Sequence, residues 1–286
     1  MRILVAGANG FIGSSLVPAL MEEHDVVALD RDPYDGPCTA SVQADLTDRG
    51  SIDDALEDVD AAYYLVHSMS SWGDFTEREQ RCAENFVAAC DAHGVDRIVY
   101  LTGILPEGSL SRHLESRKRV ADILAGGDAD LTELRAAIIL GRESASFRIM
   151  KQLVERLPVM VAPRWLSSRS QPIHVNDAVH YLTAVLDTPA TRGEWYDIGG
   201  PDIHTYRELL RILGEEMGGP PLFVPVPFLT PRLSSYWLKL VTDVPYPLAR
   251  ALVESLQEDM VVQKPIDEVI QHDCAGYRDA LRDILP

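Results

Sequence analysis

Three glycines near the amino terminus have the spacing of a phosphate-binding turn. Gly7, Gly10 and Gly13 follow the apolar run Ile3 to Ala6, and a helical pattern begins at residue 14. In such a turn one glycine bends the chain, one lets the backbone approach a pyrophosphate, and one lets helix and strand pack closely. The residues predicted to bind the pyrophosphate of a dinucleotide are Gly7, Asn9, Gly10, Phe11, Ile12 and Gly13.

Two charged residues follow the next apolar run and give opposite indications. Asp30 ends the run from residue 24 to 29, where an acid binds the adenosine ribose hydroxyls in dinucleotide folds. Arg31 could instead hold the 2′-phosphate of NADP. Because a carboxylate repels that phosphate, the pair favours NAD over NADP.

Further candidates for contact with the cofactor follow later strands. Leu46 could cover the adenine and Asp45 could accept from its amino group, although the same stretch could simply cap a helix over 51–57. His67 follows the apolar run 61–66, near the expected path of the cofactor. We therefore add Asp45, Leu46 and His67 to the predicted cofactor site.

The elements that must position these residues alternate regularly. Such alternation predicts parallel β-α-β units with right-handed crossovers, a doubly wound α/β sheet. The pattern predicts strands over 3–6, 24–29, 41–44, 61–66, 97–101 and 131–140, with helices over 14–21, 51–57, 72–94 and 112–124. Cys82, Phe86, Val87 and Cys90 share one stripe of the third helix, which indicates core packing.

The alternation loosens beyond Gly141, where prolines punctuate the chain. We expect a dinucleotide-binding domain over 1–145 and a smaller mixed substrate lobe over 146–286, partly interleaved, with a strand near 171–175 returning to the core. The apolar stretch 222–256 is expected to cap the substrate cleft; a membrane or quinone contact is the alternative. The lobe's predicted helices are 146–156, 176–187 and 205–217, and its predicted strands are 159–162, 171–175 and 194–198.

Composition narrows the classes of partner. The 286 residues carry a net charge of −18, which argues against nucleic acid. No stretch is apolar for the length of a membrane span, and the first strand starts too early for a signal peptide, so we expect a cytoplasmic protein. The four cysteines are scattered and predict no metal site. With lysines only at 118, 151, 239 and 264, the acidic excess is typical of a salt-adapted proteome.

Several longer motifs resemble those of the extended and atypical short-chain dehydrogenase/reductases, including NmrA-like proteins and epimerase-like relatives. They are GANGFIG, VVALDRDP, ENFVAAC, GVDRIVYLTG, LRAAIILG and QPIHVNDAVHYLTAVL. The resemblance implies a Rossmann sheet of strand order 3-2-1-4-5-6, with NAD or NADP across the carboxyl ends of its strands.

The chain departs from this family in the residues that transfer a proton to or from the substrate. Active members place a serine or threonine after the fifth strand and Tyr-x-x-x-Lys on the next helix. Thr102 can take the first role, but the helix reads SRHLESRKRV and contains no tyrosine. If Lys118 is the family lysine, Leu114 replaces the tyrosine; if Arg117 takes that place, His113 does. The predicted catalytic residues are Thr102, His113 and Lys118, with Arg117 as the alternative to Lys118.

These observations favour an NAD(P)-binding oxidoreductase acting on a small organic substrate. The missing tyrosine leaves a non-catalytic redox sensor or accessory protein as the alternative, and a sugar-nucleotide epimerase-like enzyme as a third. Histidine can move protons near neutral pH, so His113 is the first candidate for proton donor, followed by Tyr64, Tyr100 and His67. His174 is expected to order the junction of the lobes. Substrate, reaction direction and oligomeric state are left open.

Overall fold

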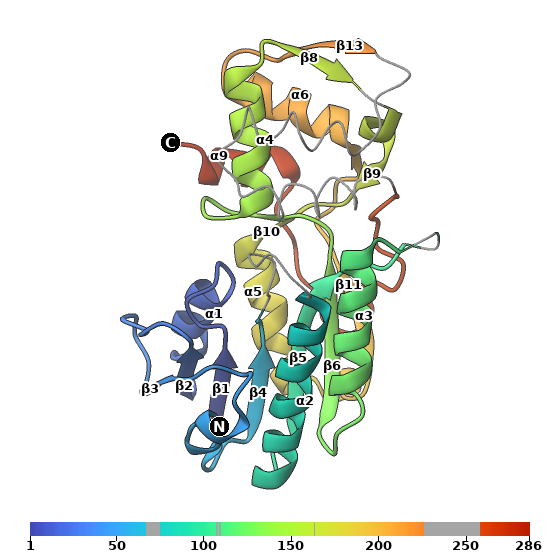
Figure 1. The fold of residues 1–286 in the computed structure, drawn as a ribbon. Coiled ribbons are helices and arrows are strands. Elements are labelled where there is room, and N and C mark those ends of the chain that lie inside the picture. Colours follow the sequence, from blue (N-terminus) through green and yellow to red (C-terminus); the bar gives the residue numbers. More distant parts are fainter. Residues whose placement is uncertain (67–74, 107, 109, 163, 226–257) are drawn as a thin grey trace.

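A seven-stranded parallel sheet forms the centre of the molecule (Figure 1). The computed structural model describes the chain except residues 67–74, 107, 109, 163 and 226–257. The strand order is β3-β2-β1-β4-β5-β6-β11, so the predicted order 3-2-1-4-5-6 is confirmed and extended by one strand. The strands are β1 (Arg2–Ala6), β2 (Asp25–Asp30), β3 (Ala40–Gln43), β4 (Ala61–Tyr64), β5 (Arg97–Gly103), β6 (Asp130–Ala136) and β11 (Trp195–Ile198).

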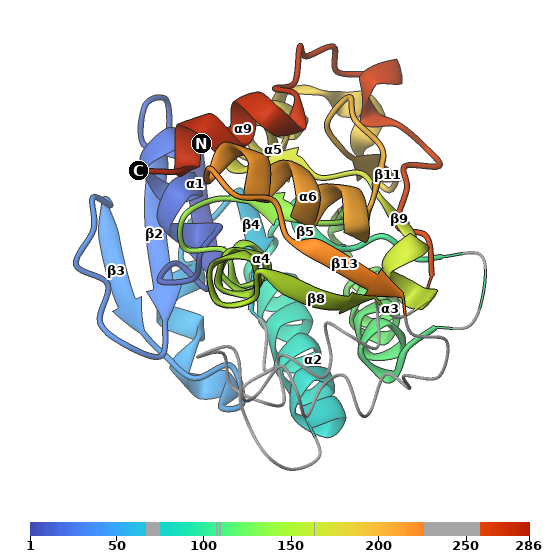
Figure 2. The same ribbon diagram turned by 90° about the horizontal axis from the view of Figure 1, so that it is seen from above.

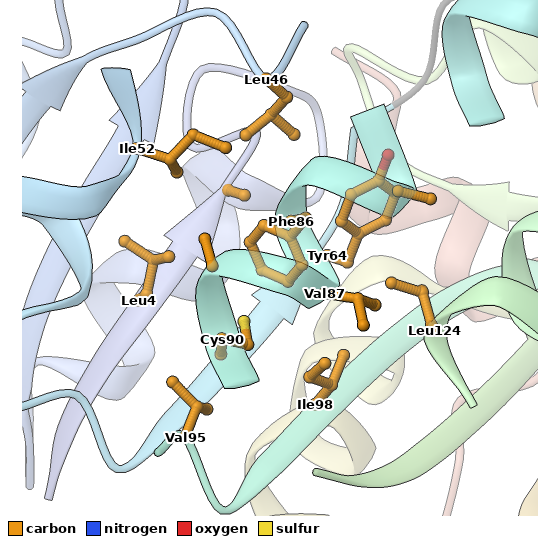
Figure 3. Packing of buried hydrophobic residues seen from close by; sticks show 14 of the residues in the cluster. Leu4, Leu46, Ile52, Tyr64, Phe86, Val87, Cys90, Val95, Ile98 and Leu124 are labelled. Carbon is orange, nitrogen blue, oxygen red and sulfur yellow. The ribbon is translucent and has the colours of Figure 1, made fainter. Parts of the chain in front are cut away.

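Helices cover both faces of this sheet because its central strands are apolar on both sides. Helices α2 (Phe75–His93) and α3 (Arg112–Leu124) cover one face, and α1 (Gly13–Leu20) and α5 (Val175–Ala184) cover the other. Phe86 and Cys90 of α2 point toward Leu4 and Tyr64 of the sheet (Figure 3). The predicted core stripe of α2 is therefore confirmed.

Two local predictions need correction. The helix expected over 51–57 is instead a pair of 3₁₀ turns, Arg49–Ser51 and Asp53–Leu56. The strand expected over 131–140 divides into β6 and the short β7 (Ile139–Leu140). The division occurs because β6 pairs with β5 and β11, whereas β7 pairs outside the sheet with β10 (Ile173–His174).

Two segments from the second half of the chain pack in or against the sheet. The segment near 171–175 contributes β10, whose Ile173 is fully buried in the core beneath α1 and α5, although β10 does not join the sheet. The strand that does join it is β11, which pairs with β6. The two predicted domains are thus interleaved more deeply than the boundary at 145 suggested.

The remaining elements form a smaller lobe beyond one end of the sheet (Figures 1 and 2). Its apolar core includes Phe147, Met150, Leu209, Leu213 and Leu281. The stretch 222–256 lies, from residue 226 onward, outside the described residues. The lobe comprises helices α4 (Ala145–Arg156), α6 (Tyr206–Glu216) and α9 (Tyr277–Ile284), and the strand pairs β8 (Val159–Ala162) with β13 (Leu222–Pro225) and β9 (Arg169–Ser170) with β12 (His204–Thr205).

The described helices were also compared with the length and hydropathy needed to cross a bilayer. None of them is both long and apolar enough to do so.

Candidate functional site

A cavity of about 560 Å³ opens at the carboxyl ends of the sheet strands. The glycine turn and Asp30 form one end of it, and Thr102, His113 and Ser144 lie at the other. Because ligands of doubly wound sheets bind in this place, the cavity is the first candidate for the functional site. It is called the cleft below.

The glycine turn has a different requirement at each of its three glycines. Gly7 has φ +92°, a conformation that favours glycine. A Cβ on Gly13 would lie 2.2 Å from the carbonyl oxygen of Gly7, so Gly13 permits the close packing of α1 on the turn. A Cβ on Gly10 would meet only that same oxygen, at 3.1 Å. Gly10 therefore keeps open the cradle into which a pyrophosphate fits.

Asp30 holds the turn as well as facing the cleft. Its Oδ2 accepts from the backbone N–H of Asn9 at 3.0 Å, and its Oδ1 accepts from that of Arg31 at 2.8 Å. Oδ1 also accepts from the backbone N–H of Asp32 at 3.4 Å, so Oδ2 is the oxygen that keeps a lone pair for a further donor. Arg31 also lines the cleft, so the acid and the base predicted to compete for the cofactor lie at the same end of it.

Asp45 and Leu46 line the cleft at its adenosine end. Oδ1 of Asp45 accepts from the backbone N–H and the hydroxyl of Thr47, both at 2.9 Å. The backbone hydrogen bond is the main reason why the pKa of Asp45 lies below its usual value, and the charge of Arg78 adds to the effect. The following 3₁₀ turn is capped by Asp48, which accepts from the backbone N–H of Gly50 at 3.2 Å, so Asp45 orders the turn beside the cleft without acting as a helix cap.

Arg78 is a cleft residue that the sequence analysis missed. It extends from α2, and its guanidinium lies 3.3 Å from Oδ2 of Asp45. The helical pattern around it offered no signal, because a charged residue at the start of a helix is usually solvated. His67, also predicted for this site, lies outside the described residues.

At the opposite end of the cleft, β5 presents a buried hydroxyl. Thr102 is 7% exposed, and its Oγ1 makes no hydrogen bond of good geometry with a described residue, although the buried hydroxyl of Tyr100 lies near it. A buried polar atom without a partner is costly, so its occurrence beside a cavity points to a ligand that supplies the partner.

The structure distinguishes the two registers of α3. His113 and Arg117, four residues apart on one helix face, both line the cleft. Lys118 faces away from it, with a 54% exposed side chain, and pairs with Asp122 at 3.3 Å. Leu114 is buried against Ile104. Of the two alternatives, Arg117 and not Lys118 therefore lines the cleft.

The surroundings of His113 bear on its predicted role as proton donor. Burial, helped by the charge of Arg117, lowers its pKa to about 3. The imidazole is therefore neutral near neutral pH, and proton donation by an imidazolium at that position is disfavoured.

The tyrosines considered as substitutes do not reach the cleft. Tyr64 and Tyr100 are at most 2% exposed, and burial raises the pKa of both phenols. Among the described residues, no tyrosine lines the cavity. His174 bridges the lobes as predicted: its Nδ1 accepts from Asn176 N–H, and its Nε2 lies 3.2 Å from Asp283 of α9.

The first turn of α4 also lines this end of the cleft, through Ser144, Ala145 and Ser146. Ser144 caps the helix by accepting from the backbone N–H of Phe147 at 3.5 Å. A serine such as Ser144 indicates the start of a helix in the sequence. That α4 starts at the cleft, however, depends on the bend between β6 and β7, which the sequence does not indicate.

Comparisons with known proteins agree with this geometry. Residues 3–107 match the model of the "NAD dependent epimerase/dehydratase family". A 2-alkyl-3-oxoalkanoate reductase of Stenotrophomonas maltophilia is 27% identical, over 87% of this chain and 84% of that protein. Subunit 9 of the NADH dehydrogenase [ubiquinone] 1 alpha subcomplex of Arabidopsis thaliana is 22% identical, over 99% of this chain and 73% of that protein.

A solved structure matches the whole fold. The Citrobacter sp. triphenylmethane reductase complexed with NADP(H) has a TM-score of 0.79 and 16% identity, with 100% of both chains covered. These findings agree with the resemblance to the short-chain dehydrogenase/reductases: residues 3–107 match the model of the NAD dependent epimerase/dehydratase family, and the whole chain has the Rossmann fold of the solved reductase. Similar solved structures hold NAD or NADP(H), so the comparisons favour neither form over the other.

Proposed function

We propose that this protein is an NAD(P)-dependent oxidoreductase of a small carbonyl compound or alcohol. The observation that carries the proposal is the unpartnered Oγ1 of Thr102 beside His113, at the opposite end of one cleft from the glycine cradle. A dinucleotide lying along the cleft would bring its nicotinamide end toward these two side chains.

Each residue at this end has a definite task. A bound nicotinamide supplies or accepts a hydride. The hydroxyl of Thr102 donates to the substrate oxygen, and the neutral imidazole of His113 can donate a second hydrogen bond without carrying a charge. The guanidinium of Arg117 adds positive potential where negative charge develops on that oxygen. The proton comes from water rather than from a tyrosine.

Reduction of an oxo group is the reaction class to test first. The relative from Stenotrophomonas maltophilia is named as a reductase of 2-alkyl-3-oxoalkanoates, which supports a carbonyl substrate. Hydride transfer from NADH deuterated at C4 to a panel of oxo acids, ketones and aldehydes would leave deuterium on the product carbon.

The variant that tests the proposal is Thr102→Val, which keeps the shape and removes the hydroxyl. We expect kcat to fall on the order of 10²–10³-fold, as when one donor to a developing oxyanion is lost, with cofactor affinity kept. Thr183→Val is the matched control, because Thr183 lies on α5 and bonds the carbonyl of His180. Full turnover in Thr102→Val would remove the basis of the assigned role.

The cofactor preference belongs to this proposal. We propose that NAD(H) binds at least as tightly as NADP(H), because the carboxylate of Asp30 stands at the adenosine end. Asp30→Ala should shift the preference toward NADP(H), with Arg31 free to hold the 2′-phosphate. Calorimetric titration with both cofactors measures the shift. A wild-type protein with strong preference for NADPH would contradict the assignment.

A second candidate is a non-catalytic NAD(P)-binding sensor or accessory protein of the cytoplasm. The observation in its favour is that no described tyrosine lines the cleft and that the imidazole of His113 there is neutral. The similarity to a subunit of an NADH dehydrogenase also supports a role as an accessory protein. Tight NAD(H) binding without deuterium transfer to any carbonyl would favour it. Sugar-nucleotide epimerisation ranks third, because that chemistry also uses the absent tyrosine.

A further inference from the structure

Three side chains of metal-ligating type meet away from the cleft. Asp177 belongs to the first turn of α5, and His272 and Cys274 belong to the segment that precedes α9. One oxygen, one nitrogen and the sulfur of these residues all lie within 4.8 Å of one another. None of the three lines the cleft.

Neighbouring groups hold two of these side chains in place. Asp177 is 7% exposed; its Oδ1 lies 2.8 Å from Nε2 of His272, and its Oδ2 accepts from the backbone N–H of Ala275 at 3.0 Å. The ring of His180 stacks on that of His272 with 3.9 Å between the centroids. The carboxylate and the imidazole are therefore oriented before any ion arrives.

The thiol is oriented by a second hydrogen-bond chain. Sγ of Cys274 lies 3.4 Å from the hydroxyl of Tyr181, and that hydroxyl donates to Asp267. Such outer contacts resemble those that fix metal ligands in proteins. The sulfur therefore stays beside the Asp177–His272 pair.

We propose that Asp177, His272 and Cys274 form a binding site for a zinc-class divalent cation. Carboxylate, imidazole and thiolate are the three ligand types that Zn²⁺ takes in proteins, and three protein ligands leave a fourth tetrahedral position for water. The ion would take the place of the hydrogen between Nε2 of His272 and Oδ1 of Asp177, and that hydrogen would move to Nδ1 of the neutral imidazole.

Binding must displace the thiol proton of Cys274. Burial and, to a smaller extent, the negative charges of Asp177, Asp267 and Asp273 raise the pKa of that thiol to about 11. The same carboxylates attract a cation, whose charge offsets their effect once it is bound. Hence one proton leaves for each ion taken up, and affinity increases with pH.

The location suggests what the ion would do for the fold. It would tie the segment before α9 to α5, and α5 packs against α1, whose first residue is Gly13. The site is thus structural and independent of the proposed reductase chemistry, so either proposal can fail alone.

Cobalt(II) is the probe that reports a thiolate ligand directly. Chelator-treated full-length protein titrated with Co²⁺ should develop sulfur-to-cobalt charge-transfer absorption and visible bands of tetrahedral cobalt, saturating at one ion per chain. Zn²⁺ should abolish these bands by displacement. Cys274→Ser should lose the charge-transfer absorption, whereas Cys38→Ser, which changes another half-buried free cysteine, should keep it.

A second variant keeps the test decisive if Cys274→Ser folds poorly. His272→Gln changes a side chain that is 25% exposed, and it should weaken Co²⁺ binding at least tenfold while circular dichroism stays unchanged. Absence of the charge-transfer absorption in the wild-type protein, its persistence in Cys274→Ser, or unchanged Co²⁺ affinity in His272→Gln would overturn the proposal.

Discussion

Individual residues of the cleft can both stabilise the fold and face the space expected for the ligand. Asp30 accepts three backbone hydrogen bonds that shape the turn, yet it also faces the space expected for the adenosine ribose. Gly13 matters for the packing of α1, whereas Gly10 matters for the opening above the turn. Neighbouring positions in one motif should therefore respond very differently to substitution.

The two glycines give the first prediction. Gly10→Ala should weaken NAD(H) binding at least tenfold and leave the thermal midpoint nearly unchanged, because its Cβ points into the cleft and approaches only the oxygen of Gly7. Gly13→Val should unfold the protein or lower its midpoint strongly, because its Cβ would overlap the backbone of Gly7 and Ala8. Calorimetric titration and thermal melts measure both effects. Unchanged affinity in Gly10→Ala would refute the placement of the pyrophosphate.

His113 gives a prediction about pH. A histidine has a pKa of about 6.5 in the unfolded chain, whereas burial lowers that of His113 to about 3 in the folded protein. Between these values the unfolded chain binds the proton more readily. The contribution of His113 to stability is thus complete above about pH 6.5 and is lost as the pH falls toward 3, at up to about 1.4 kcal/mol per pH unit.

The measurement compares urea unfolding of the wild type and His113→Gln from neutral pH down to about pH 4. The wild type should lose more unfolding free energy over this range, by on the order of 1–2 kcal/mol, because only it carries the buried imidazole. Parallel pH profiles for the two proteins would show that His113 titrates normally.

At the scale of elements, the register of α3 decides which basic residue serves the cleft. A shift of one residue turns a helical side chain by about 100°, so Arg117 and Lys118 cannot both face inward. The motif alone left both registers open, because His113 with Arg117 and Leu114 with Lys118 have the same spacing. The packing of Leu114 against Ile104, under the end of β5, selects the first.

The register predicts opposite outcomes for neighbouring substitutions. Lys118→Ala should leave cofactor affinity and turnover within about twofold of the wild type, because it removes only an exposed ion pair with Asp122. Arg117→Lys should lower cofactor affinity or turnover about tenfold or more, because a lysine lacks the planar guanidinium at this buried position. The reverse ranking, measured by calorimetry and steady-state kinetics, would restore Lys118 to the site.

Local patterns predicted the elements well and their long-range pairing poorly. The limits of α3 and β8 agree with the sequence analysis to the residue, because apolar periodicity and a capping Ser111 mark such elements locally. The pairing of β11 with β6 could not be predicted, because the sequence of a four-residue strand does not indicate which strand it pairs with. His272 and Asp177 are 95 positions apart in the sequence. The cluster of Asp177, His272 and Cys274 therefore could not be predicted from the spacing of residues.

At the scale of the whole molecule, charge is the dominant feature. The chain has 44 acidic and 26 basic residues, and the exposed ion pairs do not neutralise this excess. Self-repulsion of that kind opposes the compact state, and salt weakens it. The Debye length falls from about 10 Å near 0.1 M salt to about 3 Å near 1 M.

Salt should therefore stabilise the fold. The thermal midpoint should rise by several degrees when KCl increases from about 0.1 M to about 1 M, because repulsion between surface carboxylates is screened. Sorbitol at equal osmolarity is the control for exclusion of solute from the surface. A midpoint that is indifferent to KCl would contradict the interpretation of the acidic composition.

The central claim is that one cleft joins the glycine turn to Thr102 and His113, and that a nicotinamide dinucleotide spans it. A crystal structure of the protein with NADH bound tests this most directly. We predict the pyrophosphate at the backbone of Gly10 to Ile12, and nicotinamide C4 facing the substrate space beside Oγ1 of Thr102 and the ring of His113. A nicotinamide ring outside the cleft, or turned toward Lys118, would contradict the account.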